Sequence, residues 1–437
     1  MTGKKVTPRR MAFEVLKSID SAGSYSNLEL SSRLRSAGFD ARDSGFVSAL
    51  VYGVLERMIT LDYILSRYLS KPLQKARPDV RALLRMGAYQ IVFMDKVPSS
   101  AAVNESVKLA KSVGCSFAAG MINAVLRKVS GDDGAWKSAP WPIRYSCPQP
   151  LIDLWIDAYG KVDAQAMLEA SFGGNTTYLR VNTLRTTPEQ LIEQLRSEYV
   201  EAARVPGMED ALQVARSGAL ENLAAYREGL FHVQGLPSQI CAALLDARPG
   251  MRVADICAAP GGKSFTIAQR MQNRGSIAAF DLYPHRVELI ERGARRLGIE
   301  IITASVRDAA EDPAEGMLFD RVLCDVPCSG LGDIASKPEI RYKDTFASRE
   351  LAEVQRRILA QSSKLVAPGG RIVYSTCTLN PNENEAVCSE FLNDHPEFAL
   401  VPSQSEWARR GNNGMLTFMP QDCGGNGFFA AVLEKEG

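Results

Sequence analysis

The first third of the chain has the hydrophobic spacing of amphipathic helices. Apolar side chains recur every three or four residues, as they do on one face of a helix. The pattern is clearest at Met11, Val15, Leu16 and Ile19, at Phe46, Leu50, Val54 and Met58, at Val103, Val107 and Ala110, and from Phe117 to Leu126. Ser99 and Ser100 precede the third of these runs and are candidate helix caps. We therefore predict an all-helical domain over residues 7 to about 130.

A change of pattern follows the Gly-Asp-Asp-Gly turn at 131–134 and the Pro-Trp-Pro sequence at 140–142. Residues 150–159 and 164–171 again have helical spacing. The runs at 177–182 and 231–234 have the apolar content of strands, and Thr187 is placed to cap a helix over 188–195. These pieces predict a small α/β subdomain immediately before the C-terminal region.

From Met251 onward, short apolar runs alternate with amphipathic segments. The predicted strands are Val253–Ile256, Ile277–Phe280, Ile299–Thr303, Arg321–Cys324, Arg371–Ser375 and Phe428–Leu433, and the clearest helices are 238–246, 286–297 and the segment after Thr345. Such alternation is typical of βαβ units in a doubly wound, Rossmann-like α/β sheet. Ligands of such sheets bind at the carboxyl ends of the strands.

Charge divides the chain unevenly, although its formal net charge is only +1. Residues 1–140 hold 21 lysines and arginines against 12 acidic residues, a net charge of +9, and the remainder has a net charge of −8. A basic module beside an acidic one is compatible with docking on nucleic acid, and equally with a solvated basic surface.

Other composition features narrow the class of protein. No apolar run reaches membrane-spanning length, and the start of the chain lacks the apolar core of a signal peptide. The nine cysteines are scattered, as expected in a reducing cytoplasm. The three histidines lie away from any cysteine cluster, so we expect no metal site.

The segment Cys257-Ala-Ala-Pro-Gly-Gly-Lys263 is a glycine-rich turn between the first predicted strand and its helix, which begins at Ser264. Glycine lets the backbone approach a ligand closely, and the helix start offers free N–H groups. Neither the G-x-G-x-x-G spacing of dinucleotide sites nor the P-loop spacing is present. Asp281, at the end of the second strand, suits a ribose diol. A nucleoside without pyrophosphate fits best, and S-adenosylmethionine is the obvious candidate.

Two further strand ends carry a cysteine in a polar loop, at Asp325-Val-Pro-Cys328 and at Ser375-Thr-Cys377. Two neighbouring thiols would suit methyl transfer to C5 of a pyrimidine base. This carbon is a poor nucleophile toward a methyl group unless a thiolate first adds to C6, and the C5 proton must be removed after the transfer. Two thiols and Asp325, which can hold the pyrimidine edge or the methionine end of the cofactor, suit this chemistry. The nucleophilic thiol needs a group that lowers its pKa, and Lys263 is one candidate.

Free cysteines are more often small buried apolar residues, which is what we expect of Cys241, Cys257 and Cys324.

Together these motifs resemble those of the RNA cytosine-5 methyltransferases of the Sun family, and the helical region resembles the NusB family of RNA-binding domains. The helical resemblance rests on the order of the helices, on Val97–Glu105 and on Met121–Arg127. The combined resemblance spans essentially the full length of the chain. The chain as a whole is similar to the family members that methylate a cytosine of small-subunit ribosomal RNA.

The resemblance implies a role for each matching residue. Cys377 is the nucleophile, Cys328 assists product release, and Asp325 is the third catalytic residue. The implied S-adenosylmethionine ligands are Cys257, Ala258, Ala259, Pro260, Gly261, Gly262, Lys263, Asp281, Arg286, Asp308 and Asp325. Two positions depart from the family pattern: Val326 replaces the commoner alanine, and Asn426 stands where an aspartate is usual. Neither departure touches the chemistry.

The expected domains are a NusB-like RNA-binding domain over 1–139, a linker and small α/β subdomain over 140–236, and a methyltransferase domain over 237–437. We expect a cytoplasmic monomer without metal or membrane association. Two alternatives remain open at this point, a cytosine-5 methyltransferase of transfer RNA and a non-catalytic assembly factor. An exocyclic-amine methyltransferase would need an Asn/Asp-Pro-Pro-aromatic loop where Asp325-Val-Pro-Cys328 stands.

Overall fold

The computed structural model describes residues 6–22, 26–173, 176–214, 220–311, 316–343, 349–408 and 414–437. The chain forms two compact units. The helical unit comprises residues 1–172 together with 337–343, and the sheet unit comprises 173–336 together with 344–437. The domain boundaries expected at 139/140 and 236/237 remain predictions.

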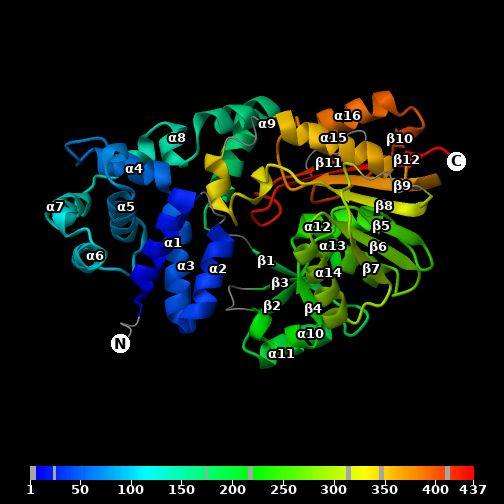
Figure 1. The fold of residues 1–437 in the computed structure, drawn as a ribbon, viewed down its shortest axis with the longest axis horizontal. Coiled ribbons are helices and arrows are strands. Elements are labelled where there is room, and N and C mark those ends of the chain that lie inside the picture. Colours follow the sequence, from blue (N-terminus) through cyan, green and yellow to red (C-terminus); the bar gives the residue numbers. More distant parts are fainter. Residues whose placement is uncertain are drawn as a thin grey trace. The chain divides into compact units, whose positions relative to one another are not determined.

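The helical unit is built from α-helices and short 3₁₀ segments (Figure 1). Its α-helices are α1 Pro8–Ala22, α2 Ser26–Ala37, α3 Ala41–Glu56, α4 Met58–Ser66, α5 Pro78–Phe93, α6 Ser99–Ser112, α7 Ala119–Val129, α8 Trp141–Arg144 and α9 Gln149–Ala170. Helix α5 is central: Val80, Leu83, Leu84 and Met86 lie in one buried core with residues of α1, α3, α4, α6 and α7. The all-helical prediction for this region is confirmed.

One local prediction in this unit needs correction. Ser99 and Ser100 do not cap α6: the helix begins at Ser99 itself, after Pro98, whose side chain offers no capping oxygen. The two helices expected over 150–159 and 164–171 are confirmed as the two parts of α9, which a kink at Gly160 separates, where φ is 80°. Glycine adopts this left-handed conformation without a steric penalty, so the chain bends there.

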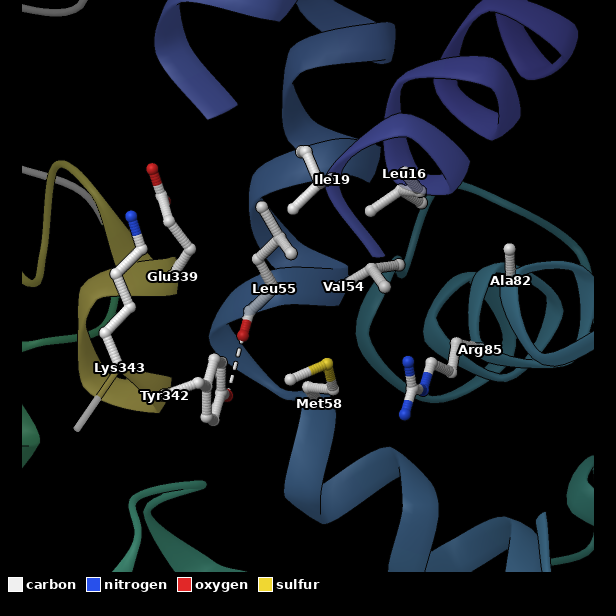
Figure 2. A pocket seen from close by; sticks show the side chains of 10 residues that line it. All are labelled: Leu16, Ile19, Val54, Leu55, Met58, Ala82, Arg85, Glu339, Tyr342 and Lys343. Carbon is white, nitrogen blue, oxygen red and sulfur yellow. Dashed lines mark hydrogen bonds between the residues drawn. The ribbon is translucent and has the colours of Figure 1, made fainter. Parts of the chain in front are cut away.

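A short segment distant in sequence completes the helical unit. Residues Pro338–Tyr342 form the 3₁₀ helix η6, whose Arg341 is 1% exposed and donates to the carbonyls of Glu56, Tyr145, Ser146 and Ser171 at 3.4 to 3.5 Å. The hydroxyl of Tyr342 donates to Leu55 O at 2.7 Å, the bond drawn in Figure 2.

Figure 2 shows a pocket of about 250 Å³ beside this segment. Its walls are apolar side chains of α1, α3, α4 and α5 on one side and the η6 region on the other: Leu16, Ile19, Val54, Leu55, Met58 and Ala82, with Arg85, Glu339, Tyr342 and Lys343.

The sheet unit contains two sheets. The smaller has strand order β2-β3-β1-β4 and is antiparallel throughout. Its strands and helices are β1 Thr177–Val181, α10 Pro188–Ser197, β2 Ala202–Val205, β3 Met208–Val214, α11 Ala224–Arg227 and β4 Phe231–Val233. The predicted cap at Thr187 is confirmed and forms a reciprocal capping box with Gln190. Sequence reasoning missed β2 and β3, which form a hairpin around Gly207.

The larger sheet has the order β10-β12-β9-β8-β5-β6-β7, with β11 paired to β12. Strands β5 to β9 are mutually parallel and β12 runs antiparallel to β9. The bounds are α12 Leu236–Leu244, β5 Arg252–Asp255, α13 Gly262–Arg270, β6 Ser276–Asp281, α14 Pro284–Leu297, β7 Ile302–Val306, β8 Phe319–Asp325, α15 Arg349–Ser363, β9 Val366–Thr376, α16 Glu385–Asp394, β10 Phe398–Leu400, β11 Met415–Phe418 and β12 Phe428–Lys435.

Helices cover both faces of this sheet, with α12, α13 and α14 on one face and α15 and α16 on the other (Figure 1). Val253 and Ala254 are neighbours on β5, yet they lie in separate hydrophobic cores, because successive strand residues point to opposite faces. The doubly wound Rossmann-like prediction is therefore confirmed. The strand predicted at Ile299–Thr303 lies three residues later, since Gly298 and Ile299 complete the end of α14.

Among the described residues, no single helix has the length and apolarity to cross a membrane. The pair α3 and α4 passes that test only when both are counted together across a 73° bend.

Candidate active site

Three acidic side chains and a cysteine lie at the carboxyl edge of the parallel sheet, and three of these four, Asp281, Asp325 and Cys377, are predicted site residues. Asp255, Asp281 and Asp325 end β5, β6 and β8, and Cys377 follows β9 directly. Strands β8 and β9 pair with Asp325 opposite Ser375, which brings the loops after these two strands together. The topology thus assembles residues that are up to 122 positions apart in the chain.

The glycine-rich turn has the conformation that its residues favour. Gly261 has a φ of 106° and immediately precedes α13, which begins at Gly262, two residues earlier than predicted. A side chain at Gly261 would be strained, and its Cβ would lie 2.3 Å from the Phe265 ring. Only glycine fits this position, so the loop can turn tightly into the helix start.

This turn lines an open cavity of about 220 Å³. The cavity walls include Cys257, Ala258, Ala259, Pro260, Gly262, Lys263 and Asp325 from the predicted set, together with Val233, Gln234, Gly235, Ser238 and Asp255. Two buried polar atoms of these walls, Asp255 Oδ1 and Gln234 Nε2, have no hydrogen-bond partner in the structure. One is an acceptor and the other a donor, which suits the ammonium and carboxylate groups of an amino acid.

The surroundings of the Asp255 carboxyl group favour the binding of a cation next to it. Its side chain is 1% exposed, and burial raises its pKa to about 7, although Ser264 Oγ donates to Oδ2 at 2.5 Å and opposes the rise. The negative charge of Asp325 raises this pKa further. A cation bound in the cavity would favour the ionised carboxylate and offset part of the cost of burying it.

Asp325 is held by two side chains. Lys263 Nζ pairs with Oδ2 at 2.7 Å, and Ser375 Oγ donates to Oδ1 at 2.7 Å. Burial alone would lower the pKa of Lys263, but the charges of Asp325, Cys241 and Asp255, together with the hydrogen bond to Asp325, outweigh this effect and raise that pKa above its ordinary value. Lys263 therefore stays charged and its proton is directed at Asp325.

Asp281 and Arg286 support the turn from the next strand. Asp281 is 2% exposed, accepts a hydrogen bond from Ala259 N at 3.2 Å and lies 3.3 Å from Arg286 Nη1. Arg286 Nη2 donates to Ala259 O at 3.0 Å. Asp308 is exposed and accepts from Ala310 N at 2.9 Å. None of these three side chains is among those lining the cavity.

The two predicted catalytic cysteines meet, with 3.2 Å between the sulfur atoms of Cys328 and Cys377. The pKa of the Cys328 thiol lies well above its ordinary value, because of its hydrogen bond to Cys377, its burial, the charge of Cys377 and that of Glu383. A negative charge on the Cys377 sulfur therefore favours the protonated form of Cys328.

The remaining cysteines behave differently. Cys241 and Cys324 are fully buried and burial raises the pKa of each to about 12, as expected of inert core thiols. Cys257 also has a strongly raised pKa because of burial, yet it lines the cavity. Within the described ranges, no group of three or more histidine, cysteine or acidic side chains is arranged to hold a metal ion.

Comparisons with known proteins now decide the family. Residues 242–434 match the model of the 16S rRNA methyltransferase RsmB/F family, residues 6–131 match the NusB family, and residues 147–221 match the RsmF/B-like ferredoxin-like domain. The probable ribosomal RNA small subunit methyltransferase B of Bacillus subtilis is 36% identical over 99% of this chain and 100% of its own length. The chain belongs to the ribosomal RNA small subunit methyltransferase B family.

Other members and solved structures agree with this assignment. The relative of the same name from Synechocystis is 33% identical over 98% of this chain and 100% of its own length. The crystal structure of PH0851 is 27% identical, covers 99% of this chain and 100% of its own, and superposes with a TM-score of 0.84. A methyltransferase homologue from Pyrococcus horikoshii is 26% identical over 70% of this chain and 100% of its own, with a TM-score of 0.60.

Family membership confirms the resemblance inferred from the motifs. This family member is an S-adenosylmethionine-dependent RNA methyltransferase, and the cofactor prediction is also confirmed. The cavity suits that cofactor on its own evidence, because the unpartnered Asp255 and Gln234 atoms match the charged methionine end.

Sequence reasoning did not select Gln234, Ser238 or Asp255 as site residues, although all three line the cavity. The Val233-Gln234 pair is a weak signal on its own and does not indicate a ligand. The available signal for Asp255 was its place at the end of the first parallel strand, where the sheet exposes ligand-binding groups.

Proposed function

We propose that this protein transfers a methyl group from S-adenosylmethionine to C5 of a specific cytosine in small-subunit (16S) ribosomal RNA, through a covalent adduct between Cys377 and C6. The observation that supports this most strongly is the pair of sulfur atoms 3.2 Å apart at the carboxyl edge of the sheet. A cytosine needs a nucleophile at C6 and a second group to complete the reaction, and two adjacent thiols provide both.

Part of the proposed cofactor ligand set follows from the cavity. Residues of the loop Cys257–Lys263 form part of its wall, and Asp255 and Gln234 hold the methionine end. Asp281, Arg286 and Asp308 do not line the cavity, and their proposed role on the adenosine side rests on the resemblance of the motifs. When bound, S-adenosylmethionine supplies an electrophilic methyl group.

The residues of the chain then act on the base. The Cys377 thiolate bonds to C6, and the electron pair of the C5–C6 double bond makes C5 nucleophilic. Asp325, oriented by Lys263 and Ser375, holds the pyrimidine edge. Once C5 carries the methyl group, loss of its proton restores the double bond and expels the Cys377 thiolate.

The close thiol pair gives Cys328 a role in this last step. Before the attack, a thiolate on Cys377 opposes ionisation of Cys328. After the attack, the Cys377 sulfur is an uncharged thioether, so this repulsion disappears and the pKa of Cys328 falls. Cys328 then becomes available to assist proton removal and release of the product.

We further propose that the helical unit supplies RNA affinity through its basic surface, and that the protein acts as a cytoplasmic monomer. The thiol pair and the cofactor cavity both lie within one sheet unit of one chain, so a second copy is not required. All nine cysteines are free, as in a reducing compartment.

Bisulfite sequencing of ribosomal and transfer RNA from a deletion strain tests the substrate and the position together. We expect one small-subunit cytosine to lose its C5 methylation in the deletion strain and to regain it when the purified enzyme and S-adenosylmethionine are added. Loss of methylation only in transfer RNA would contradict the substrate, and an unchanged pattern in both RNAs would contradict the activity.

A further inference from the structure

A buried carboxylate lies between the two cysteine loops. Glu383 is 1% exposed and belongs to the segment Asn380–Asn384, which joins β9 to α16. It does not line the cofactor cavity. Removing an ionised carboxylate from water is costly unless hydrogen bonds replace the lost hydration.

Both oxygens of Glu383 are fully used. Oε1 accepts from Ser329 Oγ at 2.5 Å and Asn380 Nδ2 at 2.9 Å, and Oε2 accepts from Ser329 N at 2.8 Å and Gln355 Nε2 at 3.0 Å. None of these four donors is charged. The carboxylate is thus a four-way acceptor at the centre of the cluster.

The same donors reach the residues on either side of Cys328. Gln355 Nε2 also donates to Pro327 O at 2.9 Å, so the residues directly before and after Cys328 are both tied to the Glu383 cluster. Movement of the Cys328 loop would therefore break several hydrogen bonds at once.

The cluster also reaches the Cys377 loop. Ser329 Oγ is 2.7 Å from Thr378 Oγ1, and the carbonyl of Glu383 accepts from the hydroxyl of Tyr374 on β9 at 2.6 Å. The two loops thus share one set of buried partners.

We propose that Glu383 is a positioning residue that holds the Cys328 thiol against Cys377, in support of the proposed adduct chemistry. Its contribution is geometric: it fixes both loops so that Cys328 can act on the adduct formed by Cys377. A thiol displaced by about 1 Å would lose about 100-fold in the rate of such a step.

Replacement by glutamine is a demanding test, because the amide has nearly the same shape but only one acceptor oxygen. The glutamine amide can adopt two orientations. If its nitrogen takes the place of Oε2, it faces two donors, Ser329 N and Gln355 Nε2. If its nitrogen takes the place of Oε1, it faces the donor Asn380 Nδ2. Either orientation leaves a buried donor unpaired, which favours displacement of the loop.

The first measurement uses the rate of disulfide formation between Cys328 and Cys377 to report how close the two thiols lie, and it needs neither RNA nor cofactor. The full-length protein is treated with diamide, which takes up two hydrogens as two thiols form a disulfide, and the Cys328–Cys377 peptide is followed by mass spectrometry. We expect Glu383→Gln to slow this disulfide about tenfold and Glu383→Asp to recover part of the rate. The control Glu390→Gln changes an exposed glutamate on α16 and should leave the rate unchanged. A wild-type rate in Glu383→Gln overturns the proposal.

The second measurement separates positioning from the proposed function. Glu383→Gln should lower kcat about 100-fold with unchanged KM for RNA and unchanged S-adenosylmethionine affinity, and its protein–RNA adduct should persist. If the wild-type protein methylates another position or forms no adduct, the proposed function fails, while the diamide result still decides the role of Glu383.

A variant that keeps the carboxylate covers the case in which Glu383→Gln does not fold. Ser329→Ala removes only the hydroxyl that joins Glu383 to Thr378. We expect slower disulfide formation in this variant as well. An unchanged rate there would contradict a shared cluster that sets the thiol separation.

Discussion

Two groups of buried polar side chains, one in the helical unit and one in the sheet unit, are hydrogen-bonded in different ways. In the helical unit, the guanidinium of Arg341 donates to four backbone carbonyls, and Thr60 likewise donates to Ile143 O. In the sheet unit, side chains meet other side chains at the strand ends, as in the Lys263–Asp325 pair and the Cys328–Cys377 pair.

The difference shows where chemistry is possible. Backbone carbonyls satisfy the hydrogen bonds of a buried polar group but do not make it a better acid, base or nucleophile. Clustered ionisable side chains, in contrast, change one another's pKa values. Parallel strands end at one edge and place such groups together, so reactivity belongs to the sheet unit. For the helical unit, with its excess of basic residues, RNA affinity is the proposed role.

The largest effect should come from Cys377. We expect Cys377→Ala to lower methylation by at least about 10⁴-fold, because the nucleophile is removed, and to form no denaturant-stable band with RNA. Denaturing gels and methyl transfer from labelled cofactor measure both. A persistent band from Cys377→Ala, with none from Cys328→Ala, would reverse the two roles.

Cys328→Ala should slow turnover by about 10²- to 10³-fold, because it removes assistance to a late step. The adduct through Cys377 still forms and should accumulate as a stable band without any inhibitor. The double variant serves as the control and should give no band. Two destabilised proteins without any band would indicate that both thiols only fill the core.

Asp255 should make the stability of the sheet unit depend on pH. Its pKa is about 7 in the folded protein against an ordinary value of 3.8, so the folded state holds the extra proton between these values. Stability should therefore fall as the pH rises, by about 2 to 3 kcal/mol between pH 5 and pH 8. Urea unfolding of the wild-type protein and Asp255→Asn checks this, since the variant should lack that loss. Parallel curves for the two proteins would contradict the raised pKa.

A smaller effect is expected at Asp281. Asp281→Asn keeps one acceptor oxygen for the turn but loses the charge, and should weaken S-adenosylmethionine binding by about 1 to 3 kcal/mol. Calorimetry measures the affinity, with Glu288→Gln on the exposed side of α14 as a matched control. Unchanged affinity in Asp281→Asn would remove this residue from the cofactor site.

The smallest effect should come from the helical unit. Lys111, Arg127 and Lys128 are exposed in the last turns of α6 and α7. Replacing all three by alanine should raise KM for RNA and reduce the slope of log affinity against log salt by about 0.7 to 0.9 for each phosphate that is no longer neutralised, with kcat unchanged. Deleting the whole unit is a poorer test, because Arg341 would lose its buried acceptors. An unchanged salt slope would place the RNA affinity elsewhere.

The sequence by itself determined the elements with regular apolar spacing, the doubly wound sheet and the candidate site at its carboxyl edge. Residues near in sequence carry these signals, since the Gly261 turn and the two cysteine loops each follow directly from a buried strand. The strands β2 and β3 were missed because Glu209, Asp210 and Arg204 interrupt their apolar pattern. Edge and hairpin strands depend on their sheet partners more than on intrinsic preference.

Only the tertiary structure decided the rest. Arg341 lies only 13 residues after Cys328 and yet is buried in the helical unit. Glu383 links the Cys328 and Cys377 loops, which are far apart in the sequence. Gln234 lines the cavity of the candidate site from the end of the smaller sheet. Each of these polar residues has an ordinary sequence context, because its role depends on which donors and acceptors the fold brings within hydrogen-bonding distance. Burial and pairing are properties of the assembled chain, and they decide whether a polar side chain is solvated, structural or reactive.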